Sequence, residues 1–422
     1  MKKIFFLTGL CILTHIANGQ ILKKVTDRTK NKAENNTNNK VNNTVDKSVD
    51  DAMNPNKNKH AVDTTKKQEV QTPEAPKTEG GPASFKTYSK YDFVPGEKVI
   101  GFEDFSTGNI GDFPAGWNTN AAAEIVTIDG KQGRWLWLTK PGVFIPEFTE
   151  AYPGDFTFEF DLLHGVPFGG ASFSFVLAEM QNRDQLQAWN TSPQTFKTSF
   201  YITSSGQKEG SVSTEIRKNS TTLSANQVST ELMSDRYNPV HVAVWRQKER
   251  IRVYVNQEKL WDIPKAIAAD AKLNALFFPI VAADATTRFY IGNLRLAVGA
   301  PDTRKKMLEQ NKWVTHGILF DVNSATIKPE SYGTLKEMAT VLKEFADLKV
   351  KIIGHTDADG ADAANLDLSQ RRAASVKSAL AKEFGIDETR METDGKGEGE
   401  PIDKNDNSAG KANNRRVEFL KI

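Results

Sequence analysis

The segment DFTFEFDL, residues 155–162, alternates phenylalanine with polar residues, and this alternation constrains the fold more than any other feature. Successive side chains of a β-strand point to opposite faces, so the pattern predicts a strand with one apolar face. Comparable short runs follow, separated by Gly, Pro, Asn and Asp: SFSFVLA, HVAVWRQ, RIRVYVNQ and RFYIGNLRLA. Many short strands with such turns predict an all-β, antiparallel sandwich over residues 94–300.

The two ends of this region carry a resemblance. The opening FEDFSTGNIGDFPAGW and the closing FYIGNLRLA resemble the first and last strands of concanavalin-like (laminin-G-like) jelly rolls. The resemblance implies a jelly-roll sandwich and names no ligand.

The first 19 residues have the anatomy of a secretory signal peptide. Two lysines precede an apolar stretch over residues 4–16, and small residues favour cleavage before Gln20. We therefore expect an exported protein. Cys11 is the only cysteine and lies inside the apolar stretch, so the mature chain has no disulfide and no cysteine metal site. Lipidation of Cys11 is disfavoured because Leu10 stands where a small residue is preferred.

Residues 20–93 are predicted to form a low-complexity, disordered tether. Asn, Lys, Thr, Asp and Glu dominate, and such a segment cannot bury enough apolar surface to offset the entropy of ordering. A thin helical stripe stays open as an alternative, since apolar residues and threonines recur mostly every four positions between residues 22 and 49.

The charge balance argues against nucleic acid as a partner. The 422 residues carry a formal net charge of only +2, and no basic cluster is interleaved with aromatic residues.

Residues 313–422 read as a compact α/β domain, because strands alternate with helices. The predicted strands are VKIIG, RMETDG and RRVEFLKI. A first helix is predicted from the spacing of Leu335, Met338, Ala339, Leu342 and Phe345. A second helix is predicted to begin at Ser369, as the N-cap, and to run through Phe384.

This strand-loop-helix unit predicts a binding site. Asp357 follows the end of a strand, Arg372 is placed in the first turn of the next helix, and Asn365 lies in the loop between them. A carboxylate, a guanidinium and free backbone amides at one mouth suit a ligand with an ammonium and a carboxylate on one centre, such as a free amino-acid end.

Five motifs in this region resemble, in order and spacing, the OmpA-like peptidoglycan-binding domain family: FDVNSATIKPES, IIGHTDADG, NLDLSQRRAASVKSAL, GKGEGEP and NNRRVEF. The resemblance implies that Asp357 and Arg372 bind the diaminopimelate side chain of the peptidoglycan stem peptide. It further implies contributions from Asn365, Thr356 and Leu366.

Less specific roles were weighed for the same residues. Asp357 could cap a turn, and Arg372 could form a surface ion pair with Asp367 or Asp362. Arg371 is expected to be solvated or to pack. Arg415 and Arg416 are expected to support the terminal strand, although one of them could line the pocket.

Metal and phosphate sites are not expected. His355 has neither a cysteine nor a second histidine near it in the sequence. Gly397 and Gly399 lack the Lys-Ser/Thr that follows a phosphate loop, so they predict a turn. We therefore expect no cofactor.

Two activities were considered for the sandwich. Glu159 and Asp161 resemble the E-x-D-x-x-E strand of laminarinase-like glycosidases, but the position of the second Glu is Leu163 or His164. We therefore expect no enzyme and a polar outer strand face. Sugar stacking would need exposed tryptophans, for which the candidates are Trp117, Trp135, Trp137, Trp189 and Trp261.

The sequence as a whole predicts an exported, non-enzymatic envelope protein with a tether, a β-sandwich binding module and a peptidoglycan anchor. It is expected in the periplasm at the cell wall, with any outer-membrane association peripheral. The alternatives are a carbohydrate-active enzyme and an adhesin whose sandwich binds a glycan or an envelope protein. The sandwich ligand, its calcium binding and the oligomeric state stay open.

Overall fold

The computed structural model describes residues 91–165, 172–187, 190–191, 194–203, 210–230, 238–282, 287–299 and 302–422. The predicted signal peptide, the predicted tether as far as residue 90 and Trp189 lie outside the described residues. All described residues belong to one compact unit of the chain.

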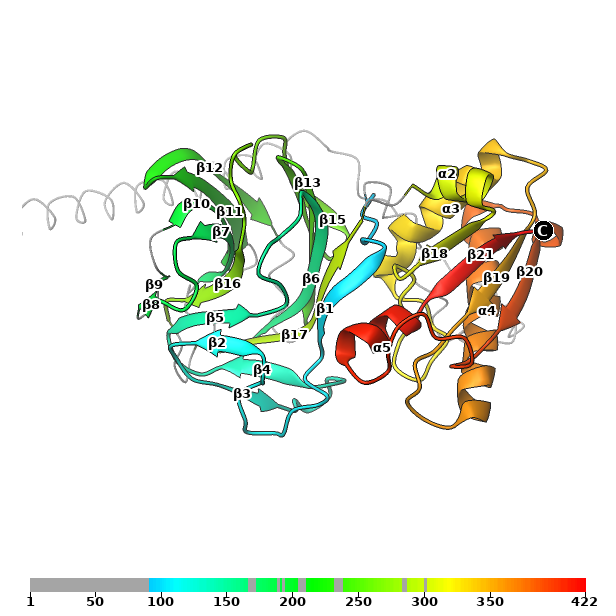
Figure 1. Cartoon of the computed structure of the whole chain (residues 1–422), viewed down its shortest axis with the longest axis horizontal. Helices are drawn as coiled ribbons and strands as arrows, with labels where there is room; N and C mark the ends of the chain where they lie inside the picture. The colour runs from blue at the N-terminus through cyan, green and yellow to red at the C-terminus, as the bar shows by residue number, and fades with distance from the viewer. Residues whose placement is uncertain are drawn as a thin grey trace, which may run out of the picture. The chain divides into compact units, whose positions relative to one another are not determined.

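Two antiparallel sheets form the middle of the chain (Figure 1). The first has the order β15-β14-β13-β6-β17-β4-β3, and β1 also pairs with β17. Its strands are β1 (Lys98–Glu103), β3 (Ala123–Val126), β4 (Trp135–Leu138), β6 (Asp155–His164), β13 (Val240–Gln247), β14 (Arg250–Val255), β15 (Glu258–Ile263) and β17 (Phe289–Val298).

The second sheet has the order β12-β11-β10-β7-β16-β5-β2. Its strands are β2 (Trp117–Thr119), β5 (Gly142–Pro146), β7 (Ser172–Met180), β10 (Gln194–Thr203), β11 (Gly210–Lys218), β12 (Thr221–Thr230) and β16 (Ala275–Ile280). A small ribbon joins β8 (Leu186–Gln187) and β9 (Asn190–Thr191). The predicted antiparallel β-sandwich is confirmed.

The alternating strand β6 shows why the sheets pack. Phe156, Phe158 and Phe160 are all buried, and Phe160 meets Phe278 of the opposite sheet edge-on at 5.5 Å between ring centroids. Inward side chains of both sheets together make one apolar core. The removal of these large aromatic surfaces from water drives the association of the sheets.

The outer face of β6 corrects one expectation. A polar, solvated face was predicted, yet Glu159 is only 2% exposed and Thr157 only 1%. The Thr157 hydroxyl accepts a hydrogen bond from the amide of Gly96 at 2.9 Å, so the chain leading into β1 covers this face. The burial comes from segments distant in sequence, which the alternation within β6 cannot reveal.

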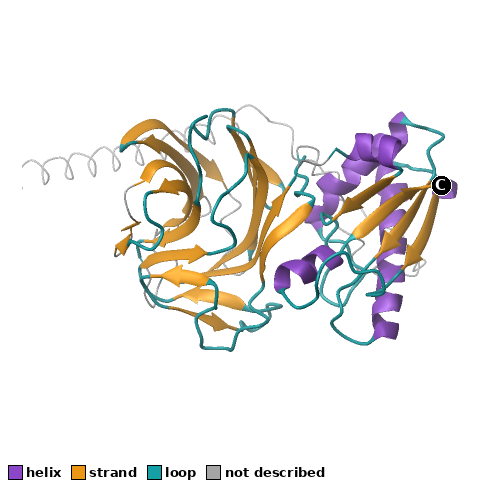
Figure 2. Ribbon diagram, viewed as in Figure 1, coloured by secondary structure: helices purple, strands orange, loops and turns teal. Residues whose placement is uncertain are grey.

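The C-terminal region is an α/β domain, as predicted. A four-stranded sheet has the order β18-β21-β19-β20, with β19 and β20 parallel and the other pairs antiparallel. The strands are β18 (Lys312–Thr315), β19 (Val350–Gly354), β20 (Met391–Gly395) and β21 (Val417–Lys421). Helices α3 (Tyr332–Glu344) and α4 (Asp362–Phe384) share an apolar core with this sheet (Figure 2).

Shorter helices complete the domain. They are α2 (Thr303–Lys305), a π-helical turn (Lys306–Gln310), two 3-10 turns (Pro329–Ser331 and Glu388–Arg390) and α5 (Ser408–Asn414). Over the described part of the chain, no helix is both long enough and apolar enough to cross a membrane.

Helix α4 begins seven residues earlier than predicted. It starts at Asp362, and Ser369 is not its N-cap but a fully buried residue within the helix. The Ser369 hydroxyl donates to the carbonyl of Leu366 at 2.7 Å and accepts from the amide of Gly397 at 2.9 Å. These tertiary contacts allow a helix through residues that favour loops locally. Its predicted end at Phe384 is confirmed, where Gly385 adopts a left-handed φ of 70°.

The sandwich and the C-terminal domain are joined by specific hydrogen bonds. The Asn413 side-chain oxygen accepts from the Val99 amide at 2.9 Å, and its nitrogen donates to the Val99 carbonyl at 3.0 Å. The Asn413 amide thus pairs with the backbone of β1 as a neighbouring strand would. Lys306 and Glu97 add an ion pair at 2.6 Å.

Candidate ligand-binding site

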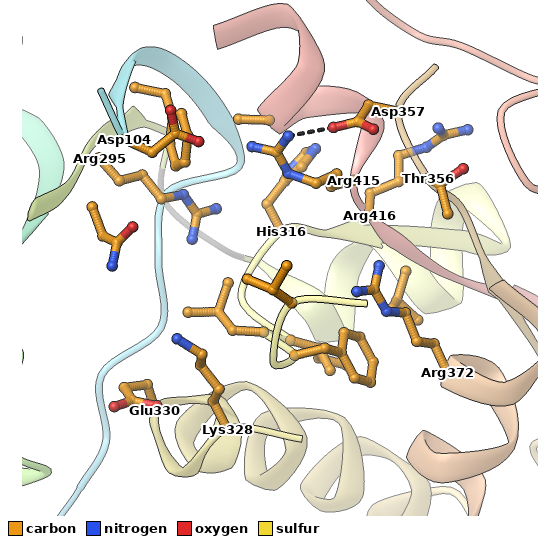
Figure 3. A pocket seen from close by; sticks show the side chains of 18 of the residues that line it. Asp104, Arg295, His316, Lys328, Glu330, Thr356, Asp357, Arg372, Arg415 and Arg416 are labelled. Atoms are coloured by element: carbon orange, nitrogen blue, oxygen red, sulfur yellow. Dashed lines mark hydrogen bonds and ion pairs between the residues drawn. The ribbon is translucent and has the colours of Figure 1, made fainter. Parts of the chain in front are cut away.

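A cavity of about 580 Å³ lies beyond the carboxyl end of β19. The C-terminal domain lines it with Thr356, Asp357, Arg372 and Arg415 among others, and the sandwich lines it with side chains of β6, β13 and β17 (Figure 3). The sandwich residues of the lining that bear charge or titrate are Asp104, Glu159, Asp161, His241 and Arg295.

Asp357 is 8% exposed and already has partners. One carboxylate oxygen accepts from the Arg415 guanidinium, and the other accepts from the amide of Asp359 at 3.2 Å. A carboxylate has about four acceptor positions, so both oxygens can still accept from a ligand ammonium.

Arg372 lies in the third turn of α4, not in the first turn of a helix as predicted. Its Nε donates to the Ser324 carbonyl at 3.0 Å, and its guanidinium lies 4.9 Å from the centre of the Phe320 ring. Burial and the nearby charge of Arg415 lower the pKa of Arg372 to about 10, so it stays protonated at neutral pH. The surface ion pair considered for it belongs to Arg371, whose Nε lies 2.8 Å from Asp367.

Asn365 supports the loop that carries Asp357. It lies in the first turn of α4, where its side-chain nitrogen donates to the carbonyls of Asp357 and Asp359 at 3.3 and 3.2 Å and to Glu398. Because these bonds occupy both N–H groups of the side-chain amide, Asn365 holds the loop that carries Asp357 in place and has no N–H left for a ligand.

Thr356 and Leu366, the other predicted site residues, lie differently. The Thr356 amide donates to the Gly397 carbonyl at 2.9 Å, and its buried hydroxyl has no hydrogen-bond partner among the described residues. Leu366 is 43% exposed and does not line the cavity. The structure therefore gathers Asp357, Arg372, Asn365 and Thr356 at one cavity and leaves Leu366 outside its lining.

Arg415, which is expected from the sequence to support the terminal strand, lines the cavity instead. Its side chain bonds Asp357 and lies 5.0 Å from the centre of the Phe102 ring, whereas Arg416 is buried and lies 2.8 Å from Glu418. Both arginines line the cavity, but it is Arg415 that bonds Asp357.

A buried ionic cluster lies on the sandwich wall of the cavity. His241 is 2.8 Å from Asp161 and 3.5 Å from Glu159, and Asn293 donates to Asp161 at 2.6 Å. Burial alone would lower the pKa of His241, but its hydrogen bond to Asp161 and the nearby carboxylate of Glu159 raise it to about 10. Glu159 and Asp161 are thus both ion-paired with His241. They do not form the free pair of carboxylates that a glycosidase uses.

The candidate metal ligand His355 and the candidate sugar-stacking tryptophans do not form a second site among the described residues. His355 is buried, with its Nε2 3.7 Å from Glu418. Across the described ranges, no group of three or more His, Cys, Asp or Glu side chains is arranged to hold a metal ion. Trp117 and Trp135 are buried, whereas Trp137 and Trp261 are half-buried.

The comparison with known families decides what the C-terminal domain is. Residues 319–415 match the OmpA family. The C-terminal domain is an OmpA family domain. The match includes Asp357, Arg372 and Arg415 and excludes the whole sandwich.

Individual relatives match about a quarter of the chain. A probable lipoprotein of Escherichia coli (strain K12), YiaD, is 47% identical over 104 residues, which is 25% of this chain and 47% of that protein. Outer membrane porin F of Pseudomonas fluorescens is 43% identical over 101 residues, 24% of this chain and 31% of that protein. The chain thus spans about half or less of the length of these relatives.

Among solved structures, the peptidoglycan-associated lipoprotein from Burkholderia pseudomallei is 26% identical, with a TM-score of 0.25. The match covers 29% of this chain and 98% of that one.

Proposed function

We propose that this protein is a non-enzymatic cell-envelope protein that binds peptidoglycan non-covalently through its OmpA family domain. The convergence of Asp357, Arg372 and Arg415 on one cavity in a domain of that family carries the proposal. The relatives, a probable lipoprotein and an outer membrane porin, support an envelope location, which we place in the periplasm at the cell wall.

The proposed ligand group is the free amino-acid centre of diaminopimelate. Its ammonium would pair with Asp357, and its carboxylate would accept from Arg372 and Arg415. Two guanidiniums stand against one carboxylate at this position, so the site requires a ligand that brings at least one negative charge. Thr356 and Asn365 would hold the loop that carries Asp357. Leu366 would contribute indirectly, as the residue that follows Asn365 in α4.

Substitution in the site tests this proposal. We expect Asp357→Ala and Arg372→Ala each to weaken binding to purified sacculi by about 2–5 kcal/mol, because Asp357→Ala removes the carboxylate that pairs with Arg415 and the ligand ammonium, and Arg372→Ala removes a partner of the ligand carboxylate. Arg371→Ala is the matched control, since its side chain is half-exposed and pairs with Asp367. Co-sedimentation with sacculi measures the effect, and thermal unfolding confirms that each variant is folded.

The type of peptidoglycan is a second arm of the same test. Sacculi with lysine in place of diaminopimelate lack the carboxylate beside the distal ammonium, so we expect weaker binding to them. Equal retention on both types, or full retention of both folded site variants, would reject the assignment.

A further inference from the structure

Arg295 on the sandwich is a buried cation whose terminal guanidinium nitrogens are not hydrogen-bonded within the described part of the chain. The residue is 6% exposed. The closest anion is Glu159, at 3.5 Å, which lies equally far from His241. Buried N–H groups without acceptors are costly, so this arrangement favours an acceptor supplied from outside the protein.

A β-bulge directs Arg295 toward the cavity. The pairing of β17 with β6 shifts register between Gly292 and Arg295, and Asn293 has a positive φ of 51°. Counted in steps of two from the core residue Ile291, position 295 would point into the sandwich core. The extra residue places Leu294 in the core instead and turns Arg295 to the outer face.

The cavity joins Arg295 to the peptidoglycan-binding residues. Arg295 and Arg372 extend toward it from opposite sides in Figure 3. Burial lowers the pKa of Arg295, Glu159 opposes this shift, and the positive charge of Arg415 adds to it. An anionic oxygen beside Arg295 would offset the cost of burying its charge and would fill the unused donors.

The cavity has room for more than one amino-acid end. A volume of about 580 Å³ falls in the range of pockets that enclose whole drug-sized ligands. A short peptide can therefore occupy both ends of the cavity at once.

We infer that Arg295 forms a second anion subsite, contributed by the sandwich, which binds another carboxylate of the same acidic stem peptide whose ammonium–carboxylate centre lies at Asp357 and Arg372. This inference rests on the proposed function. It makes the sandwich a wall of the peptidoglycan site and a determinant of which stem peptides bind.

The test uses two soluble peptides and the full chain. One is a stem tripeptide that ends in diaminopimelate and has a free α-carboxylate on its glutamate; the other is the same peptide amidated at that carboxylate. We expect wild type to bind the free acid about tenfold more tightly, which is the scale of one charged hydrogen bond. Arg295→Gln should bind both peptides with the affinity that wild type has for the amide.

Three further variants separate the possible outcomes. The double variant Glu159→Gln with Arg295→Gln removes both charges of the ion pair at once. A folding defect caused by an unpaired Glu159 therefore does not obscure the result. Arg288→Gln removes a sandwich arginine that does not line the cavity, and should behave as wild type. Arg372→Ala should abolish binding of both peptides.

The outcomes are distinguishable. If Arg372→Ala abolishes binding while Arg295→Gln and the double variant keep the preference for the free acid, the Arg295 subsite is wrong and the proposed function stands. If wild type binds neither peptide, the proposed function fails and the subsite with it.

Discussion

At the scale of single residues, His241 links stability to pH. Its pKa is about 10 in the folded protein, against 6.5 for an ordinary histidine, because Asp161 accepts a hydrogen bond from its charged form and Glu159 lies 3.5 Å from it. Above pH 6.5 the unfolded chain loses the proton while the folded protein keeps it. The stabilisation is therefore complete below pH 6.5 and is lost as the pH rises toward 10.

We expect this histidine to dominate the pH dependence of the sandwich above neutrality. Between pH 6.5 and 9.5 the free energy of unfolding should fall by about 2 kcal/mol or more, since one pKa unit corresponds to about 1.4 kcal/mol. His241→Gln should lower stability at pH 6.5 and flatten this slope. Denaturant titrations at several pH values measure both, and parallel slopes for the two proteins would contradict the prediction.

At the scale of elements, the start of α3 contacts the segment that leads into the sandwich. A Cβ added at Gly333 would come within 1.9 Å of the Phe93 carbonyl oxygen. Phe93 in turn packs edge-on against Trp245 of β13, at 6.2 Å between ring centroids. The absent side chain of Gly333 is what allows this close approach of backbone to helix.

Gly333→Ala should therefore destabilise the protein. Within a helix, the exchange of glycine for alanine normally raises the free energy of unfolding by about 1 kcal/mol. A decrease of about 1–3 kcal/mol would therefore show that the new Cβ clashes with the Phe93 carbonyl. Gly154→Ala is the matched control, because nothing lies within 4 Å of a Cβ built there. Thermal unfolding compares the two, and a Gly333→Ala protein as stable as the control would disprove the close packing.

At the scale of the whole molecule, Asn413 couples the sandwich to the OmpA family domain. Its amide makes two hydrogen bonds to Val99 and also donates to Asp403 at 2.9 Å. The backbone carbonyl of Asn413 lies 2.9 Å from His316 Nε2, beside the cavity. One residue of the NNRRVEF motif thus joins the binding domain to the strand β1.

Removal of this amide should loosen β1 specifically. Asn413→Ala leaves the buried amide and carbonyl of Val99 without partners, a penalty of about 1–3 kcal/mol for each group. We expect faster amide hydrogen exchange in β1 and α5 and little change in β10 and β11. Asn226→Ala, an exposed change on β12, is the control, and unchanged exchange in β1 would contradict the proposed coupling.

Much of the fold and part of the site could be predicted from local patterns. The alternating phenylalanines of β6 and the apolar spacing and terminal glycine of α4 are properties of neighbouring residues, and periodicity reveals them. The spacing around Asp357 and Arg372 likewise indicated one site, which the structure places at one cavity. The start of α4 was misjudged because tertiary contacts to Asn365 and Ser369 outweigh their local preference for loops.

By itself, then, the sequence determined the alternating strands, the two long helices apart from the start of α4, and the residues that resemble a known binding motif, because these depend on residues a few positions apart. Only the tertiary structure decided that Arg415 binds Asp357, 58 positions away, and that Asn413 pairs with Val99, 314 positions away. It also decided that Glu159 and Arg295 are buried at the same cavity. The burial of a charge depends on which distant segments cover it, and no local period encodes that.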